Sequence, residues 1–568
     1  MTTSYEELPA RPMVLQWAMM WLFSFTMLFG MNALLALFGL EMRAWHLPFC
    51  IVASVAMLYL IDRREQRALG LGHLLGAAVA FFVAAMLLGK FVSLIWEYSY
   101  WGRGYYTDAI LALCNGWNPV YDGIKGVSEA VYRSSKALWY VDASFYSFFG
   151  HYEMAKVHTF LLMVPTFMLT QRAFAVLLPR HRRLSALAAA VSLLNPVAFA
   201  QAFTYYGDAV LAYLIQCFLV LAFLILNEGY LHNDMLAVLA GVWLFMLHMQ
   251  GTGLRAALVL GVAFMVMVAL LYKRQALRWL AIRAGAVVVC GFAVVGFNPF
   301  VQNLLDTGHL WYSATDADGF MPQALAGKSY LGQAIASLFA SPNTSFQDSN
   351  ILLQQLTALV SSSYASADVA LRGFGFFGGW LIVVAIIVIL LQLFLPKYRD
   401  DQIDAPLYEE DEYAEEDALF DTAAEEGYVG RRVAILWLTV PLLAIAILTP
   451  TLWWARTVAA LWFVIPVAFV CLCSRRADGR SALARLLMLV TLVNVLLIAV
   501  SVVPTVISYS SDMQAYWQRM SAEELPTDED AQRHNEYVKE FKAWNTLKTR
   551  GEKEREDHAI WTKVEGLF

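Results

Sequence analysis

Charged residues are scarce in this chain. Asp, Glu, Lys and Arg make up 15% of its 568 residues, against about 25% in soluble domains. The shortage excludes an ordinary soluble domain, as does the mean hydropathy of +0.55. Basic residues are not in excess either, because 40 Lys and Arg face 46 Asp and Glu. The sequence shows no basic face, which excludes a nucleic-acid-binding protein.

Cysteine motifs and a cleavable leader are also missing. Five of the six cysteines lie in or at the edge of apolar runs, and no CxxC pair occurs. This pattern excludes a disulfide framework or a cysteine metal site. The N-terminal segment MTTSYEELPARP lacks the basic region of a signal peptide, and the apolar run after it is too long for one. We therefore expect that run to be a retained membrane helix.

Long apolar runs are abundant, and several exceed the roughly 18 residues that cross a bilayer as a helix. The sequence predicts an all-α, polytopic transmembrane helix bundle that lies in a lipid bilayer. We expect about thirteen spans, at 13–40, 46–61, 73–98, 156–178, 184–203, 209–227, 234–248, 254–272, 282–298, 374–395, 432–449, 456–473 and 485–503.

The orientation of the chain is predicted from its arginine clusters. Four predicted turns carry clusters that include Arg63, Arg180, Arg274 and Arg475, and thirteen spans place all four on one side. Loops rich in Lys and Arg stay in the cytoplasm. We therefore expect a multi-pass protein of a bacterial inner (plasma) membrane, with its N-terminus cytoplasmic and its C-terminus extracytoplasmic.

The sequence divides into a transmembrane module, 1–503, and an extracytoplasmic tail, 504–568. The module has two long outer loops, 99–155 and 299–373. Its cytoplasmic loop 396–432 is strongly acidic, which is typical of a solvated linker. The tail places Tyr537, Phe541 and Trp544 on one face of an amphipathic helix.

Four patches at the predicted outer ends of spans combine aromatic, acidic and basic residues. They are 103–122, 205–208, 298–309 and 453–456. Function is concentrated in loops that a rigid scaffold positions. We expect helix packing to bring the four patches together around one cavity.

The first patch carries a resemblance. Asp108 begins the string DAILALCNGWNPVY, in which a short helix, Ala109–Cys114, leads into a Gly116-Trp117-Asn118-Pro119 turn. This string resembles the first outer loop of the GT-C superfamily, membrane-embedded glycosyltransferases that use polyprenyl-phosphate-linked sugars. In that family the loop follows the first span, whereas here it follows the third, as an extra N-terminal hairpin would explain.

The resemblance implies an inverting transfer of a sugar to a glycan, lipid or protein acceptor in polysaccharide biosynthesis of the cell envelope. Asp108 would be the general base, with Asp208 as a second acidic residue. Arginine meets phosphate oxygens with a planar fork, and the outer-face candidates for the donor phosphate are Arg103, Arg255, Arg372 and Arg456. Residues expected to contact sugar or lipid are Tyr105, Tyr106, Trp117, His309, Trp311 and Trp453.

A divalent metal is a further expectation, shared by Asp108 and Asp208 with His309 as an additional ligand. Simpler roles compete with these functional ones. Asp108 would also suit a helix cap, and Asp142 is expected to be a solvated loop residue.

Two other functions fit many spans and large outer loops. An O-antigen-type polymerase or ligase would depend on outer arginines, here Arg372 in the 299–373 loop. A transporter or flippase of lipid-linked oligosaccharide would need ionisable residues deep within spans. Lys90 is the nearest such case.

Overall fold

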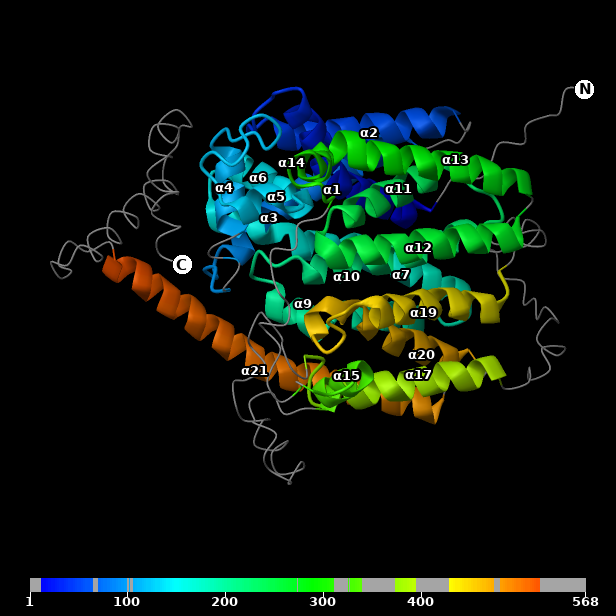
Figure 1. Ribbon diagram of the computed structural model, residues 1–568. Coiled ribbons are helices and arrows are strands. Elements are labelled where there is room, and N and C mark those ends of the chain that lie inside the picture. Colours follow the sequence, from blue (N-terminus) through cyan, green and yellow to red (C-terminus); the bar gives the residue numbers. More distant parts are fainter. Residues whose placement is uncertain are drawn as a thin grey trace, which may run out of the picture.

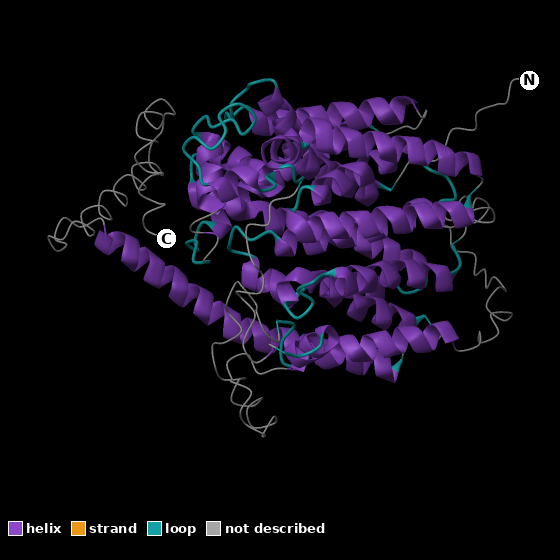
Figure 2. Cartoon of the chain, in the orientation of Figure 1, coloured by secondary structure: helices purple, strands orange, loops and turns teal. Residues whose placement is uncertain are grey.

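The computed structural model describes residues 12–64, 70–99, 102, 106–272, 274–310, 325, 327–339, 373–394, 429–474 and 481–520. In these ranges every regular element is a helix (Figure 2). The predicted all-helical class is therefore confirmed. The acidic loop and the amphipathic tail helix fall on residues outside the described ranges.

Within the described ranges, ten helices are long and apolar enough to cross a membrane. Three of them combine an α-helix with an adjoining 3₁₀ or π segment. The ten helices support the predicted multi-pass membrane protein. They are α1 (Met13–Leu37), α2 (His46–Arg64), α3 (Leu71–Val92), η2 (Tyr152–Val157) with α7 (His158–Leu177), α10 (Asp208–Asn227), α12 (Gln250–Leu271), α13 (Arg274–Cys290) with η3 (Gly291–Val295), α19 (Arg431–Leu448), η9 (Ala455–Phe463) with α20 (Val464–Cys473), and α21 (Ala482–Met520).

Three further predicted spans coincide with shorter helices. These are α8 (Arg182–Leu193), α11 (Asn233–Leu247) and α17 (Gly378–Phe394). Each of the thirteen predicted ranges thus overlaps a helix, while the number that crosses the membrane stays a prediction.

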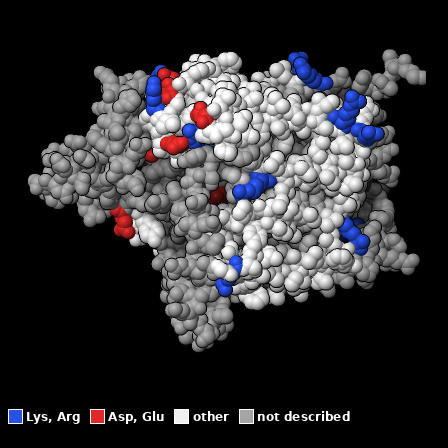
Figure 3. Space-filling view, viewed as in Figure 1, with Lys and Arg blue, Asp and Glu red and all other residues white. Residues whose placement is uncertain are grey.

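The short helices collect at one end of the bundle (Figure 1). We call this end the loop end. It carries α4 (Thr107–Cys114), α5 (Glu129–Arg133), α6 (Ala137–Phe149), α9 (Pro196–Gln201), α14 (Gln302–Thr307) and α15 (Tyr330–Phe339). All of these helices except α9 come from the segments predicted to lie outside the membrane, whereas α9 falls in the predicted span 184–203. On the face drawn in Figure 3, the surface between the two ends of the bundle is mostly uncharged, as a lipid-facing belt requires.

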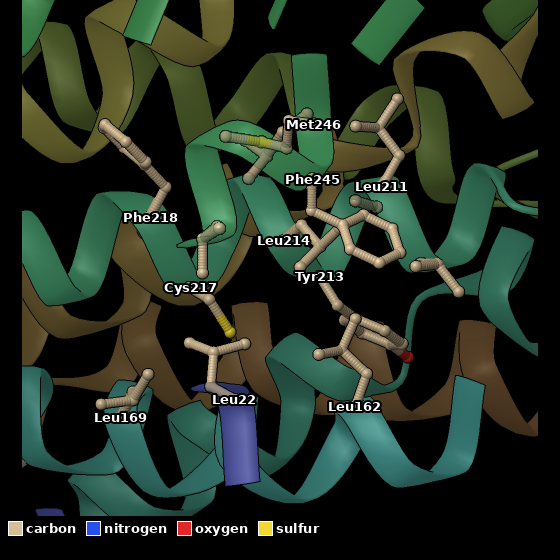
Figure 4. Packing of buried hydrophobic residues seen from close by; sticks show 14 of the residues in the cluster. Leu22, Leu162, Leu169, Leu211, Tyr213, Leu214, Cys217, Phe218, Phe245 and Met246 are labelled. Atoms are coloured by element: carbon tan, nitrogen blue, oxygen red, sulfur yellow. The ribbon is translucent and has the colours of Figure 1, made fainter. Parts of the chain in front are cut away.

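The core of the bundle is built around α10. Its sequence is apolar on every side, and a helix of this kind is stable only when it is buried all round. Every residue from Ala209 to Leu226 is buried. α10 packs against α7, α11, α12, α19 and η9. Figure 4 shows its side chains meeting those of α1, α7 and α11, among them Leu22, Leu162, Leu169, Leu211, Phe218 and Phe245.

Several predicted boundaries are wrong. α13 begins at Arg274, so Arg274, Arg278 and Arg283 lie on the helix and not in a turn. The predicted 184–203 span is broken between α8 and α9, where the Asn195 side chain caps α9 by accepting from the Val197 amide at 3.1 Å. α21 does not end near 503 but continues to Met520, so the division predicted between module and tail falls inside a helix.

The outer half of α21 packs on the chain that leaves α3. Ile498, Val502 and Val506 form a small apolar cluster with Ile95, Tyr98 and Phe203. The Trp96 amide donates to the Ser510 hydroxyl at 2.9 Å. α21 therefore supports the segment between α3 and α4.

Candidate functional site

Asp208 and Arg456 form an ion pair at the loop end. Asp208 is the first residue of α10, where the helix dipole favours a negative charge. The Arg456 Nε lies 3.4 Å from Asp208 Oδ2, and the two side chains are 14% and 13% exposed. Gln201 donates to the same carboxylate oxygen at 3.0 Å. The pair joins the second predicted patch to the fourth.

Aromatic rings hold the Arg456 guanidinium. Its Cζ lies 5.1 Å from the ring centroid of Tyr206 and 4.3 Å from that of Trp454. A planar guanidinium is well suited to such stacking. Trp453, predicted to contact sugar, stacks on Trp454 and is only 2% exposed. Trp453 therefore lies behind this cluster, and Trp454 contacts the arginine.

A pocket of about 390 Å³, part of it open to solvent, adjoins the acidic member of the pair. Its wall is formed by the segment before α4, by α6 and the residues that precede it, by the first turn of α10, and by the junction of α11 and α12. The lining residues are Tyr106, Ser135, Leu138, Trp139, Gly207, Asp208, Leu211, His248, Met249 and Thr252.

Arg255 lies one turn beyond the pocket on α12. Thr252 lines the pocket, and residues three apart share a helix face. Arg255 is half-buried. Partial burial raises the pKa of Tyr330, and the nearby Arg255 opposes this rise. Because the Tyr330 hydroxyl bonds to the Thr449 carbonyl, Arg255 lies close to the segment that leads to Arg456.

Asp108 lies in the first turn of α4 and is half-buried. The predicted helix Ala109–Cys114 is confirmed as the body of α4, and the side chain of its N-cap residue, Tyr106, makes no capping bond. Tyr106, two residues before Asp108, lines the pocket, and its ring centroid is 6.0 Å from those of Trp139 and Tyr206. The first patch therefore meets the second at the pocket, whose wall contains Asp208 but not Asp108.

The third patch reaches the same region from the other side. Phe300 lies 5.2 Å from the His248 ring in the pocket wall. Gln302 donates to the Val120 carbonyl of the first loop at 2.7 Å. His309, however, is exposed beyond the end of α14 and does not line the pocket. The four patches thus form one connected region, although the pocket itself draws on only two of them.

Trp117 lies behind the pocket wall. The Lys136 ammonium is 5.6 Å from its ring centroid and 5.9 Å from that of Trp139. Lys136 donates to the Tyr132 and Ser134 carbonyls at 2.7 and 2.8 Å, and burial lowers its pKa well below the usual range. Four predicted site residues lie outside the described residues, namely Arg103, Tyr105, Trp311 and Arg372.

The structure does not assemble the predicted metal ligands. Among the described residues, no three His, Cys, Asp or Glu side chains form a group that could hold a metal ion. Asp108, Asp208 and His309 therefore do not meet as a set. A metal on Asp108 and Asp208 alone stays a prediction.

Several site residues carried no sequence motif. Trp139 and Ser135 reach the pocket from α6 and the residue pair before it, and Gln201 reaches Asp208 from α9. The aromatic content of 99–155 was the only available signal for Trp139.

Asp142, predicted to be a solvated loop residue, is fully buried on α6. Its Oδ1 lies 2.8 Å from the Nδ1 of His158, which is also fully buried. Burial raises the pKa of the Asp142 carboxyl, and His158 opposes the rise. The prediction was wrong because α6 packs against α1, α2, α4 and η2, and these contacts bury Asp142 although the residue lies in a segment predicted to be an outer loop.

Replacing His158 by Phe is expected to lower the thermal unfolding temperature strongly, because it leaves the Asp142 carboxylate buried without its partner. Breaking one side of a buried pair typically costs about 3–5 kcal/mol. The double variant Asp142→Leu, His158→Phe should recover part of that loss. Unfolding temperatures measured in detergent check both variants, and an unchanged temperature in His158→Phe would contradict the expectation.

Comparison with known proteins gives no relative: no family model, no curated protein and no solved structure matches the chain. The function is therefore argued from the geometry of the loop end.

Proposed function

We propose that this protein is a membrane-embedded glycosyltransferase of the GT-C type. It would move a sugar from a polyprenyl-phosphate donor to a glycan, lipid or protein acceptor at the loop end. One observation carries the proposal. An arginine stacked on Tyr206 and Trp454 is paired with Asp208, which lines a pocket whose wall also contains Tyr106 and Trp139.

Arg456 and Arg255 would bind the donor phosphate. Aromatic stacking and the Asp208 pair fix the guanidinium of Arg456, so that little side-chain freedom is lost when phosphate binds. Beyond Arg255, α12 presents an exposed apolar stripe on successive turns, Leu258, Val262, Val266 and Leu270. A phosphate at Arg255 would lie at the head of this stripe, where the lipid chain of the donor enters the bilayer.

The sugar would occupy the pocket itself. Trp139 and Tyr106 offer ring faces to the apolar side of a sugar, and Ser135, Thr252 and Asp208 offer polar atoms to its hydroxyls. Sites of this kind combine mostly apolar walls with a few placed polar groups.

The reaction would be a single inverting displacement. The acceptor hydroxyl oxygen attacks the anomeric carbon and forms the new glycosidic bond. The bond from that carbon to the lipid-phosphate oxygen breaks, and the phosphate leaves with the electron pair. Arg456 stabilises its negative charge, and a carboxylate accepts the proton of the hydroxyl.

The two aspartates differ in their surroundings. Asp208 is already engaged by Arg456 and Gln201, which suits it to holding Arg456 in place. We propose Asp108 as the general base, because it begins α4 next to the chain segment that lines the pocket.

The competing functions have less support. Lys90, the candidate for a charge deep in a span, lies exposed in the last turn of α3, where it can reach the membrane surface. Arg372, on which a polymerase or ligase would depend, falls outside the described residues.

The test is sugar transfer by the purified, reconstituted protein with a panel of radiolabelled polyprenyl-phosphate sugars. We expect one donor to release polyprenyl phosphate and to give a glycosylated or hydrolysed product. Asp208→Asn should raise the KM for that donor more than it lowers kcat. Wild type that neither turns over nor binds any donor, while it transports lipid-linked oligosaccharide in vesicles, would overturn the proposal.

A further inference from the structure

A second set of buried charges lies beneath the candidate site and takes no part in the proposed chemistry. Glu97, in the segment between α3 and α4, is only 4% exposed. Its Oε1 accepts from the Ser99 amide at 2.8 Å and from the Ser99 hydroxyl. Its Oε2 accepts from the Tyr205 amide at 2.9 Å. One carboxylate therefore bonds two segments more than 100 residues apart.

A second carboxylate and a lysine complete the set. The Glu97 amide donates to both oxygens of Glu153, at 3.3 and 3.2 Å. Glu153 pairs with Lys156 one turn along η2, and Lys156 also donates to the Ile95 carbonyl at 2.7 Å. Glu153 and Lys156 are 6% and 0% exposed. Buried charges persist only when they are paired and hydrogen-bonded, and this arrangement meets that requirement.

The same network reaches the start of α4. The Tyr205 hydroxyl donates to the Tyr152 carbonyl, and the Tyr152 hydroxyl bonds to the Thr107 hydroxyl. Thr107 in turn donates to the Gly102 carbonyl. Thr107 directly precedes Asp108, and Tyr205 lies three residues before Asp208. Each candidate acid thus follows a residue that the network holds.

The chain closes tightly over the Glu97 carboxylate at Gly102. A methyl group on Gly102 would lie 2.4 Å from Glu97 Oε1 and 2.2 Å from the Ser99 hydroxyl. Only glycine allows this approach without displacement of the carboxylate.

We propose that Glu97 is the positioning residue of the site, which fixes the chain at Ser99 and the Tyr205–Asp208 turn relative to each other. The expected loss of sugar transfer when Glu97 is replaced rests on the proposed function. The expected loosening of the two segments does not. The support is geometric, because the bonds of Glu97 run to both segments and no described atom of it lines the pocket.

A pH dependence follows from the surroundings of Glu97. Burial raises the pKa of its carboxyl, and Lys156 and the Ser99 bond oppose the rise, which Glu153 reinforces. Tyr98, Tyr152 and Tyr205 also face the group. Protonation of the Glu97 carboxylate weakens it as the acceptor of the Ser99 and Tyr205 amides. We therefore expect wild-type transfer to fall, as the pH is lowered, from a pH above the usual range of a glutamate.

The experiment compares Glu97→Gln with Glu129→Gln, a control on the exposed surface of α5 at the same end. Hydrogen exchange is followed in peptides that contain Ser99 and Tyr205. In Glu97→Gln the side-chain amide cannot accept from both segments, and exchange in both peptides should rise at least about tenfold. The control should match wild type. Ser99→Ala, a milder change, should give a smaller rise in the same peptides.

Transfer is measured on the same proteins. Glu97→Gln should retain donor binding and lose most of its kcat. Its pH profile should lose the part of the acidic fall that lies above the usual range of a glutamate, and keep the fall that protonation of the general base causes at lower pH. If hydrogen exchange in both peptides of Glu97→Gln matches that of wild type, the positioning role is overturned. If Glu97→Gln does not fold, the same comparison is made with Ser99→Ala, and unchanged exchange there overturns the role as well. If wild type neither transfers sugar nor binds any donor but transports lipid-linked oligosaccharide, the proposed function fails. The exchange result then still decides whether Glu97 joins the two segments.

Discussion

Asp108→Asn is expected to lower the kcat of sugar transfer by about 100- to 10,000-fold, the usual contribution of a general base. An amide cannot take the proton of the acceptor hydroxyl, although it has almost the same shape as the carboxylate. Thr107, bonded to Tyr152 and Gly102, should keep the first turn of α4 in place. Donor binding and the unfolding temperature should therefore stay close to those of wild type. Single-turnover transfer with saturating donor measures the chemical step directly.

The matched control for this variant is Asp122→Asn in the same loop. Asp122 is exposed, and its Oδ2 accepts from the Asn118 amide at 2.6 Å, a bond that the oxygen of an asparagine can also accept. The control should transfer sugar at the wild-type rate. Full activity in Asp108→Asn would remove Asp108 as the base and leave Asp208, which lines the pocket, as the remaining acidic candidate.

The helices could be predicted because their signal is local. Apart from Gln216, α10 is apolar from Ala209 to Leu226, and its burial on all sides follows from that composition. The ends were predicted less well, because they depend on contacts with other elements. α21 continues past 503 because Ile498, Val502 and Val506 pack on the segment that leaves α3. Hydropathy along one segment contains no information about such a partner.

The site was predicted in part for the same reason. Asp208 and Arg456 each lie in a recognisable patch at the end of a span, but their pairing across 248 positions of sequence is a tertiary contact. Glu97 and Glu153 resemble ordinary loop charges, and only the fold shows that they are buried together. Asp142 was misjudged on the same ground. The sequence motifs therefore identified Asp208 and Arg456, whereas the buried residues that support them could be identified only from the structure.

Arg456→Lys is the second substitution with a large expected effect. Lysine keeps the positive charge but loses the planar fork that meets phosphate oxygens and the stacking on Tyr206 and Trp454. Loss of one preorganised electrostatic partner of the transition state typically costs on the order of 100- to 1,000-fold in rate. We expect kcat/KM for the donor to fall within that range, with the effect shared between donor affinity and kcat because the phosphate gains charge as it leaves.

The control arginine is Arg133, which lies at the same end but does not line the pocket. It is also paired with carboxylates, Glu129 at 2.7 Å and Asp306 at 3.6 Å, and lies 5.7 Å from the Tyr132 ring. Arg133→Lys thus removes the same kind of contacts away from the site and should change kcat/KM less than twofold. Equal losses in the two variants would mean that Arg456 acts through folding alone.

A double-mutant cycle of Asp208 and Arg456 then tests whether Asp208 contacts the substrate itself or only holds Arg456 in place. If Asp208 serves by holding Arg456, the loss in Asp208→Asn, Arg456→Lys should be close to that of Arg456→Lys alone, because the second change removes a support that no longer has its partner. Additive losses would mean that Asp208 contacts the substrate by itself. The cycle therefore decides, from four values of kcat/KM, whether the aspartate at the N-terminus of α10 positions the arginine or acts directly on the sugar or its acceptor.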